Sequence, residues 1–495
     1  MTFITASEIN TSTDDRDKID RRPRSERRKE ILELRRKKKK LERRLKDVLL
    51  EIELNNESTT AFGNFHFIES FKQSIDLNGI INNEFTLTKG PNSIYSAVDT
   101  LDFLLDSCIL GHSRFEHTEA LRFDPGYQDI KGIERYPSEK VFRDLFSFFT
   151  FEHIKELCSI NRRLIELRSQ WEGPQEVWFD IDSTTITLFG EQQAAEVRYN
   201  SRYRGRPSYE LMVCFINKTR DLLYIDICPE GQTPKALFKD FLSTCTALLP
   251  SNYVLKGLRI DKGFFSENNI YYLERQFLAY VAKVPMYPNI RHYIENLPPE
   301  QWKEVDDYMS VTRKKLLLDS WEHDRYIDIR RLKIENKTGQ MVLPEAQYYR
   351  YEAVLSSELE QSPEANLRWY DGRATAEDLI KEVKDGFAVE QASQHRLIKN
   401  TAYAFVKVIS YNLFQFFKAV ALPASHQSWQ IHTLRRKLIN LPGNIFGVSR
   451  NRRAKLASRA YLKLLLPQIQ RKLRQFLWFV ANDFRRYDLS LIYIK

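Results

Sequence analysis

A chain of 495 residues that is 42% hydrophobic and 29% charged has the composition of a globular protein and the length for roughly two to four domains. Its formal charge of +10 suggests a polyanionic partner, and the distribution of that charge is more informative than the sum. No apolar run reaches the roughly 18 residues of a membrane span, and Met1 to Asn10 do not resemble a signal peptide, so we expect a cytoplasmic protein with no membrane partner.

The positive charge is concentrated near the N-terminus. Between Arg16 and Lys46 there are 17 Lys or Arg and 6 Asp or Glu, a net charge of +11, whereas the whole chain has +10. Residues 1 to about 20 are expected to be disordered. Farther along, a heptad pattern of about three repeats predicts a short coiled coil. Its core positions are Ile31, Leu34, Lys38, Leu41, Leu45, Val48 and Ile52. The extension 1–61 therefore carries a helix that packs against a neighbour or its twin, contacts DNA phosphates, or does both.

Residues 62–170 are predicted to form a helical domain. Pro and Gly interrupt the sequence in "LTKGPNS" and "FDPGYQDIKGIERYPSEK", and "VFRDLFSFFTFEHIKELCSINRRLI" has apolar residues at helical spacing. Helical domains bind many kinds of partner, so this pattern alone indicates no function.

From residue 171 the pattern changes to strands. The β-rich runs "VWFDIDSTTITLF", "ELMVCFIN" and "LLYIDICP" predict an antiparallel meander. A helix, a strand, a helix and another strand follow, which is the element order of a ribonuclease-H-like α/β fold. Residues about 287–366 are rich in further strand signals, and an insertion into this fold explains them economically. The predicted catalytic domain spans 171–425, and 426–495 form a basic helical C-terminal region.

Three acids fall where such a fold would bring them together. Asp182 lies on the first strand, Asp261 ends the fourth strand in "RIDKGFFS", and Glu377 lies on a late helix. Carboxylates on separate elements can hold two Mg²⁺ ions that activate the attacking oxygen and stabilise the leaving oxygen in phosphoryl transfer. Asp180, two residues before Asp182, would share its face of the sheet. The five scattered cysteines contain no CxxC pair, which argues against a zinc site.

The motifs "DIDSTTITLFG", "YNSRYRGRPSYE", "RIDKGFFS" and "YDGRATAEDLIKEVK" together resemble the DDE transposases of bacterial insertion sequences. The spacing Y-x2-R-x3-E-x6-K marks the branch with a Tyr, Arg, Glu, Lys signature, and "RGRPSY" and "LPG" point to the insertion-sequence thirteen-eighty group. The resemblance covers residues about 62 to 480. It implies that residues 62–170 bind DNA and that 171–425 form a ribonuclease-H-like catalytic core.

The resemblance also implies roles for single residues. Asp182, Asp261 and Glu377 would be the catalytic acids and metal ligands, with Mg²⁺ as the cofactor and Mn²⁺ as its substitute. Asp180 would be an acid behind the ligands or only a polar strand residue. Tyr370, Arg373 and Lys384 would hold DNA phosphates, with Arg373, Glu377 and Lys384 on nearly one face of a helix. Ordinary surface ion pairs are the alternative for these helical residues.

The segment after the first catalytic strand mixes basic and aromatic residues that suit phosphate contacts and base stacking. The residues predicted to bind DNA there are Tyr199, Arg202, Arg204 and Arg206, with Tyr203 and Tyr209 as further aromatic candidates. In related enzymes an inserted β domain supplies a Trp that stacks on a flipped base. Trp302 and Trp321 are both open candidates here, and a core position is an equally good explanation for each.

The function expected from the resemblance is cut-and-paste DNA transposition in the bacterial nucleoid. The protein would bind the terminal inverted repeats, cleave at their ends and join the 3′-hydroxyls to target DNA, as a homodimer in the synaptic complex. Two alternatives are a ribonuclease-H-like nuclease without strand transfer and a domesticated DNA-binding protein that no longer cleaves. The intact acids and the Tyr, Arg, Glu, Lys spacing argue against both.

Overall fold

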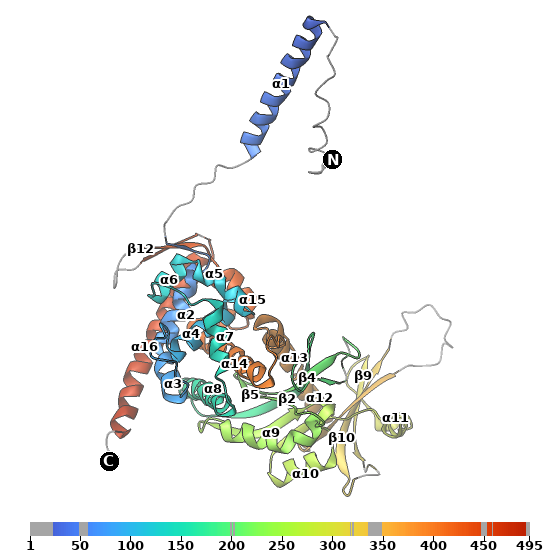
Figure 1. The fold of residues 1–495 in the computed structure, drawn as a ribbon. Helices are drawn as coiled ribbons and strands as arrows, with labels where there is room; N and C mark the ends of the chain where they lie inside the picture. Colours follow the sequence, from blue (N-terminus) through green and yellow to red (C-terminus); the bar gives the residue numbers. More distant parts are fainter. Residues whose placement is uncertain are drawn as a thin grey trace. The chain divides into compact units, whose positions relative to one another are not determined.

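The computed structural model describes residues 23–48, 58–198, 200, 203–316, 318, 321–334, 349–446, 453–457 and 459–491. The chain divides into two compact units, Met1–Glu57 and Ser58–Lys495, and each is described by itself. The described part of the first unit is a single helix, α1 (Arg24–Val48), drawn in blue in Figure 1. The last expected heptad position, Ile52, lies outside the described residues.

After the short strand β1 (Thr59–Thr60), the first part of the second unit is helical. Local sequence signals set their ends: α4 starts at a capping box formed by Ser96 and Asp99 and stops at Gly111, whose φ of +99° suits glycine. The bounds are α2 (His66–Ser74), α3 (Leu77–Glu84), α4 (Ala97–Leu110), α5 (Glu119–Arg122), α6 (Pro125–Lys131), α7 (Glu139–Ser147) and α8 (Phe151–Glu172).

A large sheet follows, and its core has the strand order β5-β4-β2-β6-β7. The first three strands are antiparallel neighbours, whereas β2, β6 and β7 run parallel. The mixed α/β fold is confirmed, and this order is consistent with a ribonuclease-H-like core. The elements are β2 (Gln175–Thr187), β3 (Glu196–Val197), β4 (Pro207–Ile216), β5 (Leu222–Ile227), α9 (Pro234–Leu248), β6 (Tyr253–Ile260), α10 (Glu267–Arg275) and β7 (Ala279–Lys283).

The β-rich segment that the sequence predicts as an insertion extends this same sheet. Strand β11 pairs antiparallel with β7, and β10, β9 and β8 follow in order, so the insertion lengthens the sheet at the β7 edge. Figure 1 shows β9 and β10 in yellow beside the green core strands. The bounds are α11 (Pro288–Glu295), β8 (Lys303–Glu304), β9 (Met309–Leu316), β10 (Arg325–Lys333) and β11 (Tyr349–Ser356).

The helix α14 (Leu397–Ala421) joins the helical part to the sheet. It is buried along almost its whole length and packs against α4, α8 and β5. One apolar core therefore runs from the N-terminal helices across α14 to the outer strands of the sheet. No described helix has the length and apolar character needed to cross a membrane.

The C-terminal region contains strands as well as the predicted helices. Strands β12 (Gly443–Phe446) and β13 (Arg453–Leu456) form a three-stranded sheet with β1 (Thr59–Thr60). The partner strand lies more than 380 residues earlier in the chain, so no local pattern reveals this pairing. The helices of this region are α15 (Ile431–Leu434) and α16 (Leu462–Leu491).

Candidate active site

Neighbouring parallel strands bring the first two predicted acids together. On β2, Phe179 and Ile181 are fully buried on one face of the sheet. Asp180 and Asp182 alternate with them and therefore point to the other face. Ile181 pairs in register with Ile260, the last residue of β6. Asp182 and Asp261 each follow one member of this pair, and therefore sit side by side where β6 ends and β2 continues toward Thr187.

The third acid comes from the helix after the insertion. Glu377 lies in α13 (Ala374–Lys381) and its side chain is 69% exposed, whereas that of Asp182 is 13% exposed. Arg373, which precedes α13, contacts all three acids. Its guanidinium nitrogens lie 2.5 Å from Asp182 Oδ2, 3.4 Å from Glu377 Oε1 and 3.9 Å from Asp261 Oδ1. The three predicted acids thus surround one positive charge.

The pKa of Asp182 is raised above that of an ordinary carboxyl group. Burial raises its pKa to about 6, the nearby Asp261 and Glu377 carboxylates add to the rise, and Arg373 opposes it. A bound divalent cation would compete with the proton that Asp182 takes up below this pKa. Carboxylate oxygens are the ligands that a hard cation such as Mg²⁺ or Mn²⁺ takes. In this structure the Arg373 guanidinium lies among the three carboxylates and their ligand atoms do not all lie within 4.8 Å of one another, so an ion would bind there only once the acids draw closer and Arg373 shifts. Asp182, Asp261 and Glu377 could together hold such an ion.

Asp180 is engaged elsewhere. It is 2% exposed and accepts two hydrogen bonds from Arg259, from Nε at 2.6 Å and from Nη2 at 2.8 Å. The third Arg259 nitrogen donates to the Trp369 carbonyl at 2.8 Å, at the end of α12 (Pro363–Asp371). Asp180 therefore serves as the anchor of Arg259, which ties β2 and β6 to α12, the helix preceding Arg373.

The predicted phosphate-binding residues do not share one helix. Tyr370 lies in the last turn of α12, Arg373 precedes α13, and Lys384 lies in the π-helical turn η6 (Glu382–Gly386). The expected common helical face is therefore interrupted at Gly372 and again at the π-turn, where the 3.6-residue period fails. Lys384 Nζ donates to Thr184 Oγ1 and to the Thr185 carbonyl, both at 3.1 Å, and so contacts β2 beyond Asp182.

Tyr370 is nearly buried beside Arg373 and the three acids. Its side chain is 8% exposed, and burial raises its pKa above the ordinary value. Two cations, Lys283 at 5.4 Å and Arg373 at 5.9 Å, face its ring. Tyr370 therefore packs beside the guanidinium that contacts the acids.

The basic loop after β2 is described in part. Tyr199 and Arg202 lie outside the described residues. Arg204 is exposed, and Arg206 stacks at 5.2 Å on the ring of Phe189. Tyr209 is buried and its hydroxyl donates to the Gln193 carbonyl at 2.6 Å, so this tyrosine has a structural place on β4.

Phe189 belongs to a cleft that the sequence did not reveal. It is 66% exposed just beyond β2 and meets Tyr203 edge to face, with ring centroids 5.5 Å apart. The cleft has a volume of about 890 Å³. Its lining includes Thr184, Lys384, Phe189 and Tyr203 from the sheet side and Arg114 and Arg143 from the helical side. The sequence shows only an aromatic residue directly after the predicted strand, which is too common a pattern to reveal a cleft.

The two candidate tryptophans have protein partners. Trp302 is 8% exposed, with Arg331 stacked on its ring at 4.5 Å. Trp321 is half-buried and stacks on Phe265, with ring centroids 5.1 Å apart. These contacts give both a structural role and leave the choice between them open.

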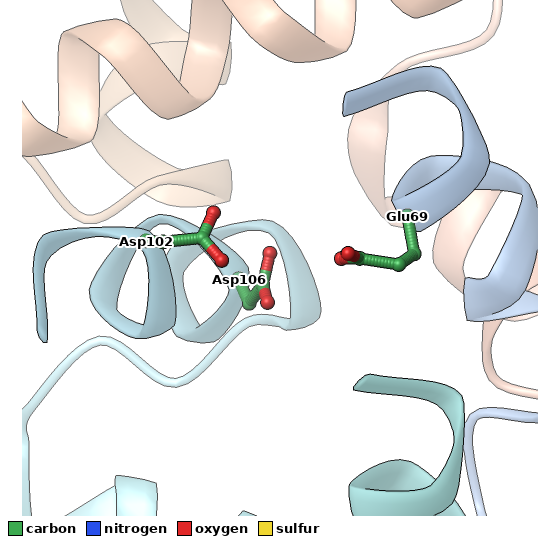
Figure 2. A group of neighbouring side chains, drawn as sticks. All are labelled: Glu69, Asp102 and Asp106. Carbon is green, nitrogen blue, oxygen red and sulfur yellow. The ribbon is translucent and has the colours of Figure 1, made fainter. Parts of the chain in front are cut away.

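A second acidic cluster lies in the helical part, where Figure 2 shows Glu69, Asp102 and Asp106 facing one another. Within the described ranges, these are the only three Asp, Glu, His or Cys residues whose ligand atoms all lie within 4.8 Å of one another. Two buried lysines already occupy the space between them. Lys131 Nζ lies 2.7, 2.6 and 3.0 Å from the three carboxylates, and Lys72 also contacts all three. This cluster is a buried ion-pair network, and its cations leave no need for a metal.

Comparison with known proteins shows the family to which the chain belongs. The family model described as "Transposase DDE domain group 1" matches residues 46–478. No curated protein matches the chain. Among solved structures, the chain is similar to that of the piggyBac transposase in a synaptic complex with hairpin DNA, at 11% identity and a TM-score of 0.40, over 88% of this chain and 84% of that one.

Proposed function

Because the chain belongs to the family of transposases with a DDE domain, we propose that it binds the terminal inverted repeats of its own insertion sequence and cleaves DNA at their ends. The same site would then join the 3′-hydroxyls to target DNA. Membership of the family makes the protein a DNA-processing enzyme and implies the use of a divalent metal. The spacing of Tyr370, Arg373, Glu377 and Lys384 supports the Tyr, Arg, Glu, Lys branch. The elements "RGRPSY" and "LPG" support the insertion-sequence thirteen-eighty group.

One observation carries the proposal. Asp182, Asp261 and Glu377 come from three separate elements and converge on the Arg373 guanidinium. We assign these acids as the ligands of Mg²⁺, with Mn²⁺ as its substitute. When bound between such carboxylates, divalent cations activate the attacking oxygen and stabilise the leaving oxygen of phosphoryl transfer.

The residues of the chain would position the scissile phosphate. Arg373 has a buried Nε with no hydrogen-bond partner among the described residues, and a phosphate oxygen would reach this donor only if the groups that cover it move. Its other nitrogens hold Asp182 and Glu377 in place. Tyr370 supports the guanidinium through its ring. Positioning and charge stabilisation supply most of the catalysis in phosphoryl transfer, which suits this arrangement.

The cleft beyond β2 would hold the DNA strand whose phosphate reaches the three acids. Lys384 would neutralise a phosphate there, and the exposed aromatic surface of Phe189 and Tyr203 would contact an unpaired base once Arg206 leaves the Phe189 ring. Arg114 and Arg143 would hold the backbone from the helical side, which supports a DNA-binding role for residues 62–170. Tyr199, Arg202, Arg204 and Arg206 remain proposed contacts of the same DNA. Such a substrate places the proposed activity at the nucleoid.

The test uses labelled duplex DNA that carries the native end of the element, read from the sequence that flanks the gene. The full chain should cut at the end when Mg²⁺ or Mn²⁺ is present and stop when a chelator is added. DNA with a scrambled end should be left uncut. Cutting of both DNAs alike would favour the nuclease without strand transfer, and binding with no cutting in either metal would favour the non-cleaving DNA-binding protein.

A further inference from the structure

The helix α1 has an exposed apolar stripe. Ile31, Leu34 and Leu41 are 51, 57 and 60% exposed, and their spacing around Lys38 is that of the core positions of a heptad repeat. Leu45 and Val48 continue the spacing in the sequence to the end of the helix. An isolated helix in water gains little from its own hydrogen bonds, and such a stripe stabilises it when a second helix covers it.

The charges beside the stripe are complementary to a second copy of the same helix. In a parallel, in-register coiled coil, a residue at heptad position g faces the residue at position e of the following heptad on the partner helix. With Ile31 at position a, Glu30 and Lys37 are at g, and Arg35 and Glu42 are at e. This places Glu30 opposite Arg35 of the second copy and Lys37 opposite Glu42 of the second copy. By symmetry each pairing occurs twice. Both opposite-charge pairings follow from the register that the apolar residues set.

We propose that α1 pairs with α1 of a second copy of this chain as a parallel two-stranded coiled coil. Lys38 occupies one central core position, where a single polar residue selects register and oligomeric state at some cost in stability. Its ammonium group lies 4.0 Å from Glu42 of its own helix, so the side chain already leans out of the stripe. This inference goes beyond the proposed chemistry and does not depend on it.

The pairing is weak unless the two chains are already close. Arg24–Val48 contains 13 Lys or Arg and 5 Asp or Glu, so each helix carries a net charge of +8 and the two repel. Tethering two chains in one complex raises their effective concentration to roughly millimolar and offsets a weak contact. Salt screens the repulsion, so pairing should strengthen as salt is raised, whereas binding of DNA phosphates weakens.

Cysteine cross-linking of the full chain tests the pairing. Leu34→Cys places two thiols face to face in the parallel coil, whereas Arg36→Cys points them outward from it. The five natural cysteines are buried, so the unaltered chain gives the background. Under mild oxidation without DNA, Leu34→Cys should form at least about fivefold more covalent dimer than Arg36→Cys, and more at high salt than at low salt.

Charge reversal in the Leu34→Cys background tests the register. Lys37→Glu and Glu42→Lys should each reduce the covalent dimer about fivefold, and the double reversal should restore it, because opposite charges then meet again. Equal cross-linking from positions 34 and 36, or reversals with no effect and no rescue, would overturn the proposal. The readout is a protein gel, so it stands whether or not the chain cleaves DNA.

Discussion

Glu377→Gln should reduce Mg²⁺-dependent cleavage of the element end by at least about 10³-fold and leave binding of that DNA nearly unchanged. The replacement keeps the size of the side chain and removes its charge. Glu377 is 69% exposed, so the change removes no core packing. The loss should therefore appear in the rate of cleavage and not in the amount of folded protein.

Asp378→Asn is the matched control for this variant. Asp378 is the next residue of α13, is also exposed, and has no part in the contacts of Arg373. It should cleave at nearly the rate of the unaltered protein. If Glu377→Gln cleaved as fast as Asp378→Asn, the assignment of the third acid would be wrong.

Lys72→Met should lower the free energy of unfolding by about 3–5 kcal/mol, because it leaves three buried carboxylates with Lys131 alone of the two buried lysines. Lys72 is 3% exposed and lies 2.5 Å from Asp102 and 3.4 Å from Glu69. Burial raises the pKa of Asp106 in the same cluster, and Lys131 and Lys72 oppose that rise. Urea unfolding at several pH values measures the loss, which should shrink as pH falls and the acids of the folded variant take up protons.

An exposed ion pair gives the comparison for Lys72→Met. Lys155 lies 2.8 Å from Glu152, but both side chains are more than 70% exposed, so Lys155→Met should change stability by less than about 1 kcal/mol. Mg²⁺ should not restore the stability of Lys72→Met. Restoration by Mg²⁺ would instead identify the cluster of Glu69, Asp102 and Asp106 as a metal site.

The positions of the first two acids were predictable because strand alternation and strand order are local properties. The β-branched and aromatic residues of β2 fix the alternation, and the parallel pairing of β2 with β6 then sets Asp182 beside Asp261. The mixed α/β fold followed from the same patterns. The bidentate pairing of Asp180 with Arg259 was not visible, since it joins residues 79 positions apart.

The late helix shows where periodicity failed. The segment from Tyr370 to Lys384 reads as one helix, but it breaks at Gly372 and ends in a π-turn. Lys384 consequently faces Thr184 on β2 and not Glu377. Contacts across the sheet, and the Arg373 contact to three acids on separate elements, depend on tertiary packing that no spacing rule contains.

Binding of Mn²⁺ to the full chain at about pH 5 and about pH 7 is the most direct test of the central claim, that Asp182, Asp261 and Glu377 form the metal centre. Because the pKa of Asp182 is raised to about 6, the proton competes at the lower pH and binding should be about tenfold weaker there. Asp182→Asn should abolish that binding, and Glu69→Gln should leave it intact. Binding that is independent of pH, persists in Asp182→Asn and disappears in Glu69→Gln would contradict the account.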